Sequence, residues 1–369
     1  MLRSITARKW KMHTPWGPLA GLDLSGHDLA ERILAADKHQ LAEGLVVECL
    51  FDQIVSSIPA TSAQVLALDV ETVIVDPRRT IGRWLAFVWA RTKSSGLGRY
   101  LCALGKGFDT YLLEFSAGAF HAARMEEGRR VSDYQPLPAL MSTLSGGRYT
   151  PFQVDTSVRD TNRQRQAFWG FLSEYYGKNL GERVVLPRLL INCAIQPYFR
   201  SVWNLDRAFV SGDRIWLFEI KHKFPMDRSS LGFGINDGEL RMLHRLAASG
   251  IGCLHTILAK PYWSKDVGSM YLLNDLAMRA RAGLIAKVLD ARETTAILKG
   301  AAGTSGTHTS INGASSLKFR TMPASGFSRL GVLSDAPASL AASMAGLMLG
   351  NRPPDVTDAW LRSLRAPRP

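Results

Sequence analysis

The sequence contains little cysteine: four residues in a chain of 369, with no Cys-x-x-Cys pair among them. Scattered cysteines of this kind exclude a zinc ribbon, and they would be sparse for a disulfide framework in a chain of this length. We therefore expect Cys49, Cys102, Cys193 and Cys253 to be reduced core residues of a cytoplasmic protein.

Long apolar runs are also missing. The two longest, 65–75 and 340–349, fall short of the roughly 20 residues that a membrane-spanning helix needs, and Asp69 and Glu71 interrupt the first. The N-terminal stretch MLRSITARKWKMHTPW is basic but has no continuous apolar region, so it is not typical of a secretory signal. We expect neither a membrane partner nor export.

Acidic residues are scarce relative to basic ones, 32 against 45, which leaves a net charge of +13. A charge of this size draws polyanions to a protein surface, and nucleic acid is the partner that it favours. The hydrophobic share of 46% is ordinary for a globular protein, and 369 residues can build more than one core.

The chain has three predicted parts. Residues 1–150 form an N-terminal α+β domain, with a helix predicted at 27–52 and a strand at 64–76, and the stretch SGGRYTP at 145–151 marks its end. Residues 151–298 form a second domain, for which a long helix is predicted at 270–298. Residues 299–369 begin with a Gly-, Ser- and Thr-rich stretch and are expected to be a flexible linker and a short helical tail.

The most informative stretch contains two β-rich runs, RAFV and RIWLFEIKHK. Gly212-Asp213 between the runs is a plausible two-residue hairpin loop, in which Ser211 pairs with Arg214. Counting outward places Asp206 opposite Glu219, and directly opposed residues have Cβ atoms about 4.5–5.5 Å apart.

Lys221 joins this pair of acids. It lies two residues after Glu219, so alternation along the strand returns it to the same face. Two carboxylates and an ammonium group then meet at one sheet edge, which predicts a site for a divalent cation. Downstream, Asn236 or Asp237 caps a helix at 238–248, and a buried strand follows at 251–259.

Asp206, then Glu219-Ile220-Lys221 on the next strand, then a helix entered through GINDGELRML, resembles the PD-(D/E)XK nuclease superfamily, with its restriction-endonuclease-like and resolvase-like cores. The superfamily order of helix, strand, strand, strand, helix, strand fits residues from about 163 to 260. The resemblance implies an α/β fold with a mixed central β-sheet flanked by helices in the second domain.

The resemblance also implies a set of roles. In the superfamily the first helix often gives one more acid to the metal, and Glu174 of the predicted helix 164–176 is the match. Glu239 stands where relatives often carry Gln, and is expected to be auxiliary. Mg2+, or Mn2+ in its place, would be bound by Asp206, Glu219, the backbone carbonyl of Ile220 and Glu174.

The expected activity is a Mg2+-dependent deoxyribonuclease, acting as an endonuclease rather than an exonuclease, with RNA as the less favoured substrate. Lys221 would orient the attacking water or stabilise charge on the phosphate. Lys223, Arg207 and Arg228 would contact the nucleic acid backbone. Many relatives cut both strands as dimers, so the resemblance allows a homodimer, and the sequence leaves the oligomeric state open.

Three alternatives stay open. The protein could be a nuclease-derived module that binds DNA or protein without turnover. The charged groups could form a salt-bridged hairpin, with Lys221 on Asp206, and Arg207 or Lys223 on Glu219. The stretch LALDVET, with Asp69 and Glu71, resembles the first motif of DnaQ-like exonucleases, but no convincing further motif of that family follows it.

Overall fold

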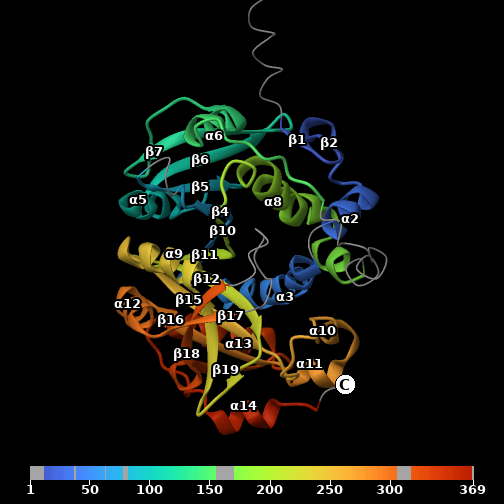
Figure 1. Cartoon of the computed structure of the whole chain (residues 1–369), viewed down its shortest axis with the longest axis vertical. Helices are drawn as coiled ribbons and strands as arrows, with labels where there is room; N and C mark the ends of the chain where they lie inside the picture. Colours follow the sequence, from blue (N-terminus) through green and yellow to red (C-terminus); the bar gives the residue numbers. More distant parts are fainter. Residues whose placement is uncertain are drawn as a thin grey trace, which may run out of the picture. The chain divides into compact units, whose positions relative to one another are not determined.

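The computed structural model describes residues 12–36, 39–62, 64–77, 82–154, 170–305 and 317–367 (Figure 1). The chain divides into two compact units. Unit 1 comprises residues 1–42 and 69–205, and unit 2 comprises residues 43–68 and 206–369. Within the described ranges, no helix has both the length and the apolar character that crossing a bilayer requires.

This division differs from the one predicted near residues 150 and 299. Gly146 and Gly147 have positive φ and turn the chain after a helix, and the N–H of Thr150 bonds the carbonyl of Pro197 at 2.8 Å. The Gly-rich stretch is therefore a turn inside unit 1. The C-terminal segment supplies strands and helices to unit 2, where a linker and tail were expected.

Unit 1 is built on a seven-stranded sheet with the order β10-β4-β5-β6-β7-β8, in which β9 also pairs with β7. β5 and β6 are parallel and joined by α5, and the other pairs are antiparallel. The elements of unit 1 are β1 (His13–Thr14), β2 (Gly17–Pro18), η1 (Leu19–Gly21), α2 (His27–Ala35), β4 (Val70–Val75), β5 (Trp84–Ala90), α5 (Leu97–Gly107), β6 (Phe108–Ser116), β7 (Ala119–Glu126), β8 (Arg129–Arg130), β9 (Gln135–Pro136), α6 (Leu137–Leu144), η2 (Gly177–Asn179), η3 (Gly181–Val185), α8 (Leu186–Leu189), η4 (Leu190–Ile195) and β10 (Val202–Leu205).

Unit 2 holds a six-stranded sheet with the order β19-β16-β15-β12-β11-β3 and a four-stranded sheet with the order β13-β14-β18-β17. Its helix α3 begins four residues before the unit does. The elements are α3 (His39–Val55), α4 (Ile58–Thr61), β3 (Val65–Leu68), β11 (Arg207–Ser211), β12 (Arg214–Lys223), β13 (Met226–Asp227), β14 (Leu231–Asn236), α9 (Asp237–Ala248), β15 (Ile251–Ala259), α10 (Tyr271–Asn274), α11 (Leu276–Ala280), β16 (Gly283–Leu289), α12 (Ala291–Lys299), β17 (Ala302–Ser305), β18 (Leu317–Pro323), η5 (Ala324–Gly326), β19 (Ser328–Val332), α13 (Pro337–Met348) and α14 (Asp358–Leu364).

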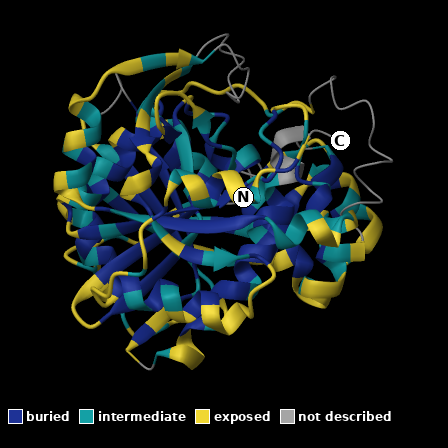
Figure 2. Ribbon diagram, turned by 90° about the horizontal axis from the view of Figure 1, so that it is seen from below, coloured by how far each residue is buried: buried dark blue, intermediate teal, exposed yellow. Residues whose placement is uncertain are grey.

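The six-stranded sheet is mixed, which confirms the predicted α/β class. β3, β11 and β12 are consecutive antiparallel neighbours, whereas β12 and β15 are parallel and joined through α9. Figure 2 shows strands coloured as buried, and β12 and β15 are buried along most of their length. This sheet is the core of unit 2.

Helices cover both faces of this sheet. On one face, Phe51 of α3 packs against Phe218, with ring centroids 6.2 Å apart. Glu219 and Lys221 point to the opposite face because side chains alternate along β12. α9 lies on that second face, where Glu239 of its first turn approaches Lys221.

The elements that follow the hairpin agree closely with the predicted ones. The side chain of Asn236 accepts a hydrogen bond from the N–H of Gly238 at 2.8 Å and so caps α9, as its position suggests. Gly250, with φ of 85°, turns the chain into β15. The predicted helix at 238–248 and strand at 251–259 are therefore confirmed.

Two longer predicted elements are wrong. The helix expected at 270–298 is broken into α10, α11, β16 and α12, because GLIAKVL at 283–289 pairs with β15 and β19 as a buried strand. The single strand expected at 64–76 is divided at Asp69. β3 joins the sheet of unit 2, and β4 joins the sheet of unit 1.

Candidate functional site

The β11–β12 hairpin has the predicted register. The pairs run from Ser211 and Arg214 to Arg207 and Phe218, so the next position outward places Asp206 opposite Glu219. Gly212 has φ of 54°, a conformation that glycine tolerates at the first position of a two-residue loop. The tight loop therefore determines which acids oppose each other.

Asp206 lies where the chain leaves the hairpin. The preceding residue, Leu205, belongs to β10 and pairs with Thr72 in unit 1, so it is not available to continue the β11 ladder. The carboxylate of Asp206 instead accepts the N–H of Ile220 at 2.8 Å. In an antiparallel ladder the N–H and C=O of such a residue point to the same side, so the carbonyl of Ile220 also points toward the β11 side.

Lys221 is held among carboxylates. Its ammonium group donates a hydrogen bond to Glu219 and lies 3.4 Å from Oε1 of Glu239. Burial alone would lower the pKa of Lys221, but Glu219, Glu239 and Asp206 together raise it well above its usual value. Lys221 is therefore a permanent positive charge at this site. We call Asp206, Glu219, Lys221 and Glu239 the hairpin cluster.

Glu219 and Glu239 of the hairpin cluster are buried, and Asp206 is half-buried. Burial, together with the nearby Glu219 and Glu48, raises the pKa of Asp206 well above its usual value. Burial also raises the pKa of Glu219 to about 7, although Lys221 opposes the shift. Burial would raise the pKa of Glu239 too, but Lys221 and neighbouring cations outweigh it and lower that pKa. Asp206 and Glu219 therefore hold their protons more tightly than exposed carboxylic acids do, because Lys221 does not compensate two negative charges in this environment.

Glu48 of α3 is a residue that sequence reasoning missed. It lies close enough to raise the pKa values of both Asp206 and Glu219. The sequence predicted this helix, but about 150 residues separate Glu48 from the hairpin and nothing local linked them. Glu174, the acid predicted for this role, is exposed and belongs to unit 1, whereas the hairpin cluster belongs to unit 2. Residues 164–169 of the predicted helix 164–176 lie outside the described residues, and the described part, 170–176, is helical.

His255 lies beside the hairpin cluster. It is the parallel-strand neighbour of Glu219 and is fully buried. In the described part of the chain, neither of its ring nitrogens has a hydrogen-bond partner. Burial, with a contribution from Lys223 and Lys221, lowers the pKa of His255 to about 3. The ring is therefore neutral at physiological pH.

The three basic residues expected to contact DNA have different surroundings. The guanidinium of Arg207 bonds the carboxylate of Asp52 on α3, and so links that helix to β11. Lys223 donates a hydrogen bond to the carbonyl of Gly234, and burial lowers its pKa. Arg228 is exposed. The salt-bridged alternative expected Lys221 on Asp206, and Arg207 or Lys223 on Glu219. Among the described residues the ammonium group of Lys221 instead bonds Glu219, and neither Arg207 nor Lys223 pairs with that acid, so the expected pairs are not formed.

Asp69 and Glu71, the acids of the DnaQ-like alternative, both have basic partners in unit 1. Arg91 lies 3.1 Å from Glu71 and 3.4 Å from Asp69, and Arg183 also binds Asp69. Both acids are therefore paired with guanidinium groups.

Among the residues that the structure describes, no three His, Cys, Asp or Glu side chains are grouped in a way that could hold one metal ion. The hairpin itself therefore offers two carboxylates as oxygen donors, Asp206 and Glu219, with the carbonyl of Ile220 facing the β11 side, and Glu239 of α9 is not grouped with both of them. Comparisons of the chain with protein-family models, with curated proteins and with solved structures found no match.

Proposed function

We propose that unit 2 is a Mg2+-dependent nuclease that hydrolyses phosphodiester bonds of DNA at the hairpin cluster. The observation that carries the proposal is the meeting of Asp206, Glu219 and Lys221 at the end of one hairpin, in surroundings that raise the pKa of both acids. Two carboxylates held together in this way repel each other, and a divalent cation would relieve that repulsion.

The order of elements in unit 2 supports the same proposal. α3, β3, β11, β12, α9 and β15 come in the order helix, strand, strand, strand, helix, strand. The short helix α4 lies between α3 and β3, residues 69–205 are inserted between the first two strands, and β13 and β14 lie between β12 and α9. This is the order that the PD-(D/E)XK resemblance implies. The first helix and first strand are α3 and β3, whereas the first helix was predicted at 164–176. We propose accordingly that the core of unit 2 is restriction-endonuclease-like.

The donor set suits Mg2+. Carboxylate and carbonyl oxygens are the hard ligands that this ion prefers, and it usually keeps several waters. Asp206, Glu219 and the carbonyl of Ile220 would hold it, and the bound ion would polarise the scissile phosphate. Glu48 does not join the two acids as a third side-chain ligand. We propose that it instead accepts a hydrogen bond from a water molecule bound to the ion.

Lys221 has a specific part in this proposal. Because its pKa is raised, it stays protonated and is not suited to be a general base. Its ammonium group instead stabilises negative charge that grows on the phosphate, or orients the attacking water. The net charge of +13 favours encounter with the polyanionic substrate.

The test is nicking of supercoiled plasmid in Mg2+, in Mn2+ and in EDTA. We expect nicking with either ion and none in EDTA, and losses of at least about a hundredfold for Glu219→Gln and Lys221→Ala. Lys299→Ala on α12, which removes an exposed charge, is the control and should nick as the wild type does.

A second candidate is a nuclease-derived binding module without turnover. The hydrogen bond between Lys221 and Glu219 favours it, because an ammonium group already paired with a carboxylate also fits a purely structural role. DNA binding that persists without nicking under both metal ions would select this candidate over the nuclease.

A further inference from the structure

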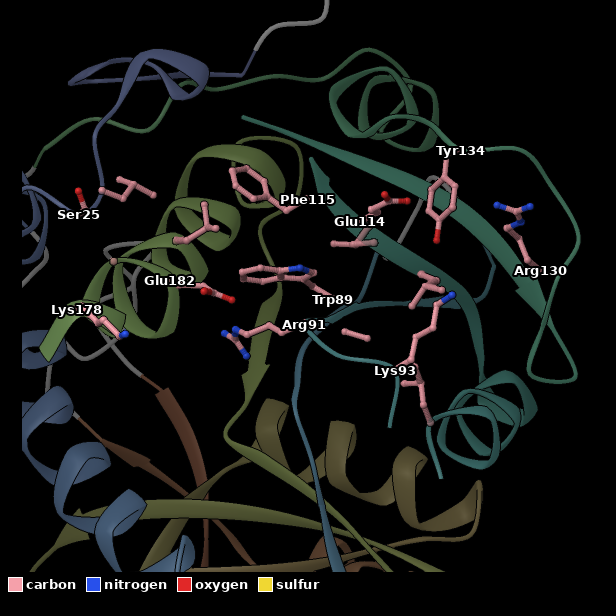
Figure 3. A pocket seen from close by; sticks show the side chains of 17 residues that line it. Ser25, Trp89, Arg91, Lys93, Glu114, Phe115, Arg130, Tyr134, Lys178 and Glu182 are labelled. Atoms are coloured by element: carbon pink, nitrogen blue, oxygen red, sulfur yellow. The ribbon is translucent and has the colours of Figure 1, made fainter. Parts of the chain in front are cut away.

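Unit 1 contains a half-open pocket of about 780 Å3 that the proposed chemistry of unit 2 does not use (Figure 3). Residues of β5 and β6, the segment after β5, the region of β8 and β9, and the helical segment 178–186 form its walls. All of its lining residues belong to unit 1. The side chains on which the inference depends are Trp89, Phe115, Tyr134, Lys93, Arg130 and Lys178.

The pocket has positive charges to offer a ligand. Lys93, Arg130 and Lys178 are exposed, and among the described residues neither lysine has a carboxylate within ion-pair distance. Two carboxylates, Glu114 and Glu182, also line the pocket. Three available cations and two acids favour a ligand with only one or two negative charges, such as a phosphodiester, over a triphosphate.

Aromatic side chains also line the pocket, and because Trp89 is only 4% exposed, the rings open to a ligand are those of Phe115 and Tyr134. The guanidinium of Arg91 lies 4.5 Å from the centre of the Trp89 ring, and that of Arg130 lies 5.2 Å from the centre of the Tyr134 ring. Phe115 packs edge-on against Trp89, with ring centroids 6.2 Å apart. Aromatic rings and guanidinium planes are the groups on which unpaired bases stack.

We propose that this pocket binds a nucleotide unit of a single-stranded nucleic acid. The base lies against the aromatic side chains, and Lys93, Arg130 and Lys178 contact the adjoining phosphates. Glu114 and Glu182 accept hydrogen bonds from amino or imino groups on the base edge. The bases of a duplex are stacked inside the helix and cannot enter such a pocket, so the site discriminates against double strands. DNA and RNA share this chemistry.

The test is fluorescence anisotropy of labelled oligo(dT) and oligo(rU) in EDTA, where metal-dependent cleavage cannot contribute. The pocket variant is Lys93→Ala/Arg130→Ala. The matched control is Lys106→Ala/Arg129→Ala, which removes the same charge from α5 and β8 at positions outside the pocket lining. We expect affinity to fall roughly tenfold in the pocket variant. The slope of the logarithm of the binding constant against the logarithm of the salt concentration should become shallower by about 0.7 for each lost phosphate contact. The control should stay within about twofold of the wild type.

Tyr134→Ala provides a second measurement that does not change the charge. Losing one stacking surface should weaken binding by at least about fivefold while leaving the salt dependence unchanged. Whichever of oligo(dT) and oligo(rU) binds with the higher affinity shows whether the pocket prefers DNA or RNA.

Equal losses in the pocket variant and the control would overturn the proposal, as would equally tight binding of a duplex, or no binding by the wild type. Plasmid nicking by the wild type is measured in parallel. If the wild type binds the oligonucleotide through the pocket but fails to nick plasmid, the nuclease proposal fails while the pocket proposal stands.

Discussion

Glu219 combines burial with a crowded electrostatic environment. It is 5% exposed, hydrogen-bonded to Lys221 and close to further acids. A buried carboxylate normally needs compensation, and Lys221 supplies only part of it, because the pKa of Glu219 is still raised. Because part of the cost of burying the Glu219 carboxylate is not compensated, a bound cation would stabilise its ionised form.

This environment predicts a pH dependence of stability in EDTA. With a pKa of about 7 in the folded protein, against 4.5 for an ordinary glutamate, Glu219 keeps a proton that the unfolded chain has released between those pH values. The folded state then binds more protons, so the contribution of Glu219 to the unfolding free energy falls as pH rises through this window and levels off above it.

Glu219→Gln removes this pH-dependent contribution to the unfolding free energy, because glutamine does not titrate. The wild-type unfolding free energy minus that of the variant should fall by on the order of 3 kcal/mol between about pH 4.5 and pH 7.5. Urea unfolding at intervals of pH measures the difference. Parallel curves for the two proteins would show that Glu219 titrates as an ordinary glutamate.

At the scale of elements, α3 joins a sheet built mostly from residues far away in the sequence. The bond between Arg207 and Asp52 and the packing of Phe51 on Phe218 hold the helix against β11 and β12. Glu48 lies one turn before Asp52 on the same helix, which is why it approaches Asp206.

Substitutions can test Glu48 against Glu174, the acid predicted from the sequence. Glu48→Gln should raise the Mg2+ concentration needed for half-maximal nicking by roughly tenfold, as the loss of an outer-shell partner typically does. Glu174→Gln should leave it unchanged because Glu174 is an exposed residue of unit 1. A metal titration of plasmid nicking measures both, and the reverse ranking would refute the assignment.

A second element-scale feature is the close approach of η3 to the chain before α2. A Cβ on Gly181 would lie 2.1 Å from the carbonyl oxygen of Leu24, a backbone atom that cannot move away cheaply. Gly181→Ala should therefore destabilise the protein by about 1–3 kcal/mol. Gly105→Ala in α5 is the matched control, since a Cβ there meets no described atom within 4 Å. It should stabilise by roughly 0.5–1 kcal/mol, because alanine favours helix. Thermal unfolding compares the two variants. Equal stabilities would contradict the close packing of Gly181 against the carbonyl of Leu24.

At the scale of the whole molecule, residues 69–205 are inserted between two neighbouring strands of unit 2, β3 and β11. The arrangement gives each unit its own sheet and its own candidate site: the hairpin cluster in unit 2 and the aromatic pocket in unit 1.

Hydrogen–deuterium exchange should show the two sites separately. Mg2+ is expected to slow exchange in peptides covering 43–55 and 206–221, because the ion fixes the end of the hairpin and its neighbouring helix. A single-stranded oligonucleotide should slow exchange in 89–93, 112–134 and 178–186. Protection of 170–176 by Mg2+, without protection of 43–55, would contradict the assignment of α3 to the site.

The sequence by itself determined the local parts of this protein. The two-residue loop at Gly212 set the register that opposes Asp206 to Glu219, and alternation along the strand placed Lys221 beside them. The cap at Asn236 and the apolar run after Gly250 predicted α9 and β15. Each of these features depends on residues close together in the chain.

Only the tertiary structure decided which distant segments complete the site. Residues 43–68 join the sheet of residues 206–332 across an insertion of more than a hundred residues, and local patterns carry no sign of such pairing. GLIAKVL became a strand because β15 and β19 flank it, which overrides its local periodicity. Glu48 could not be identified for the same reason: burial and charge at a point depend on every segment that reaches it.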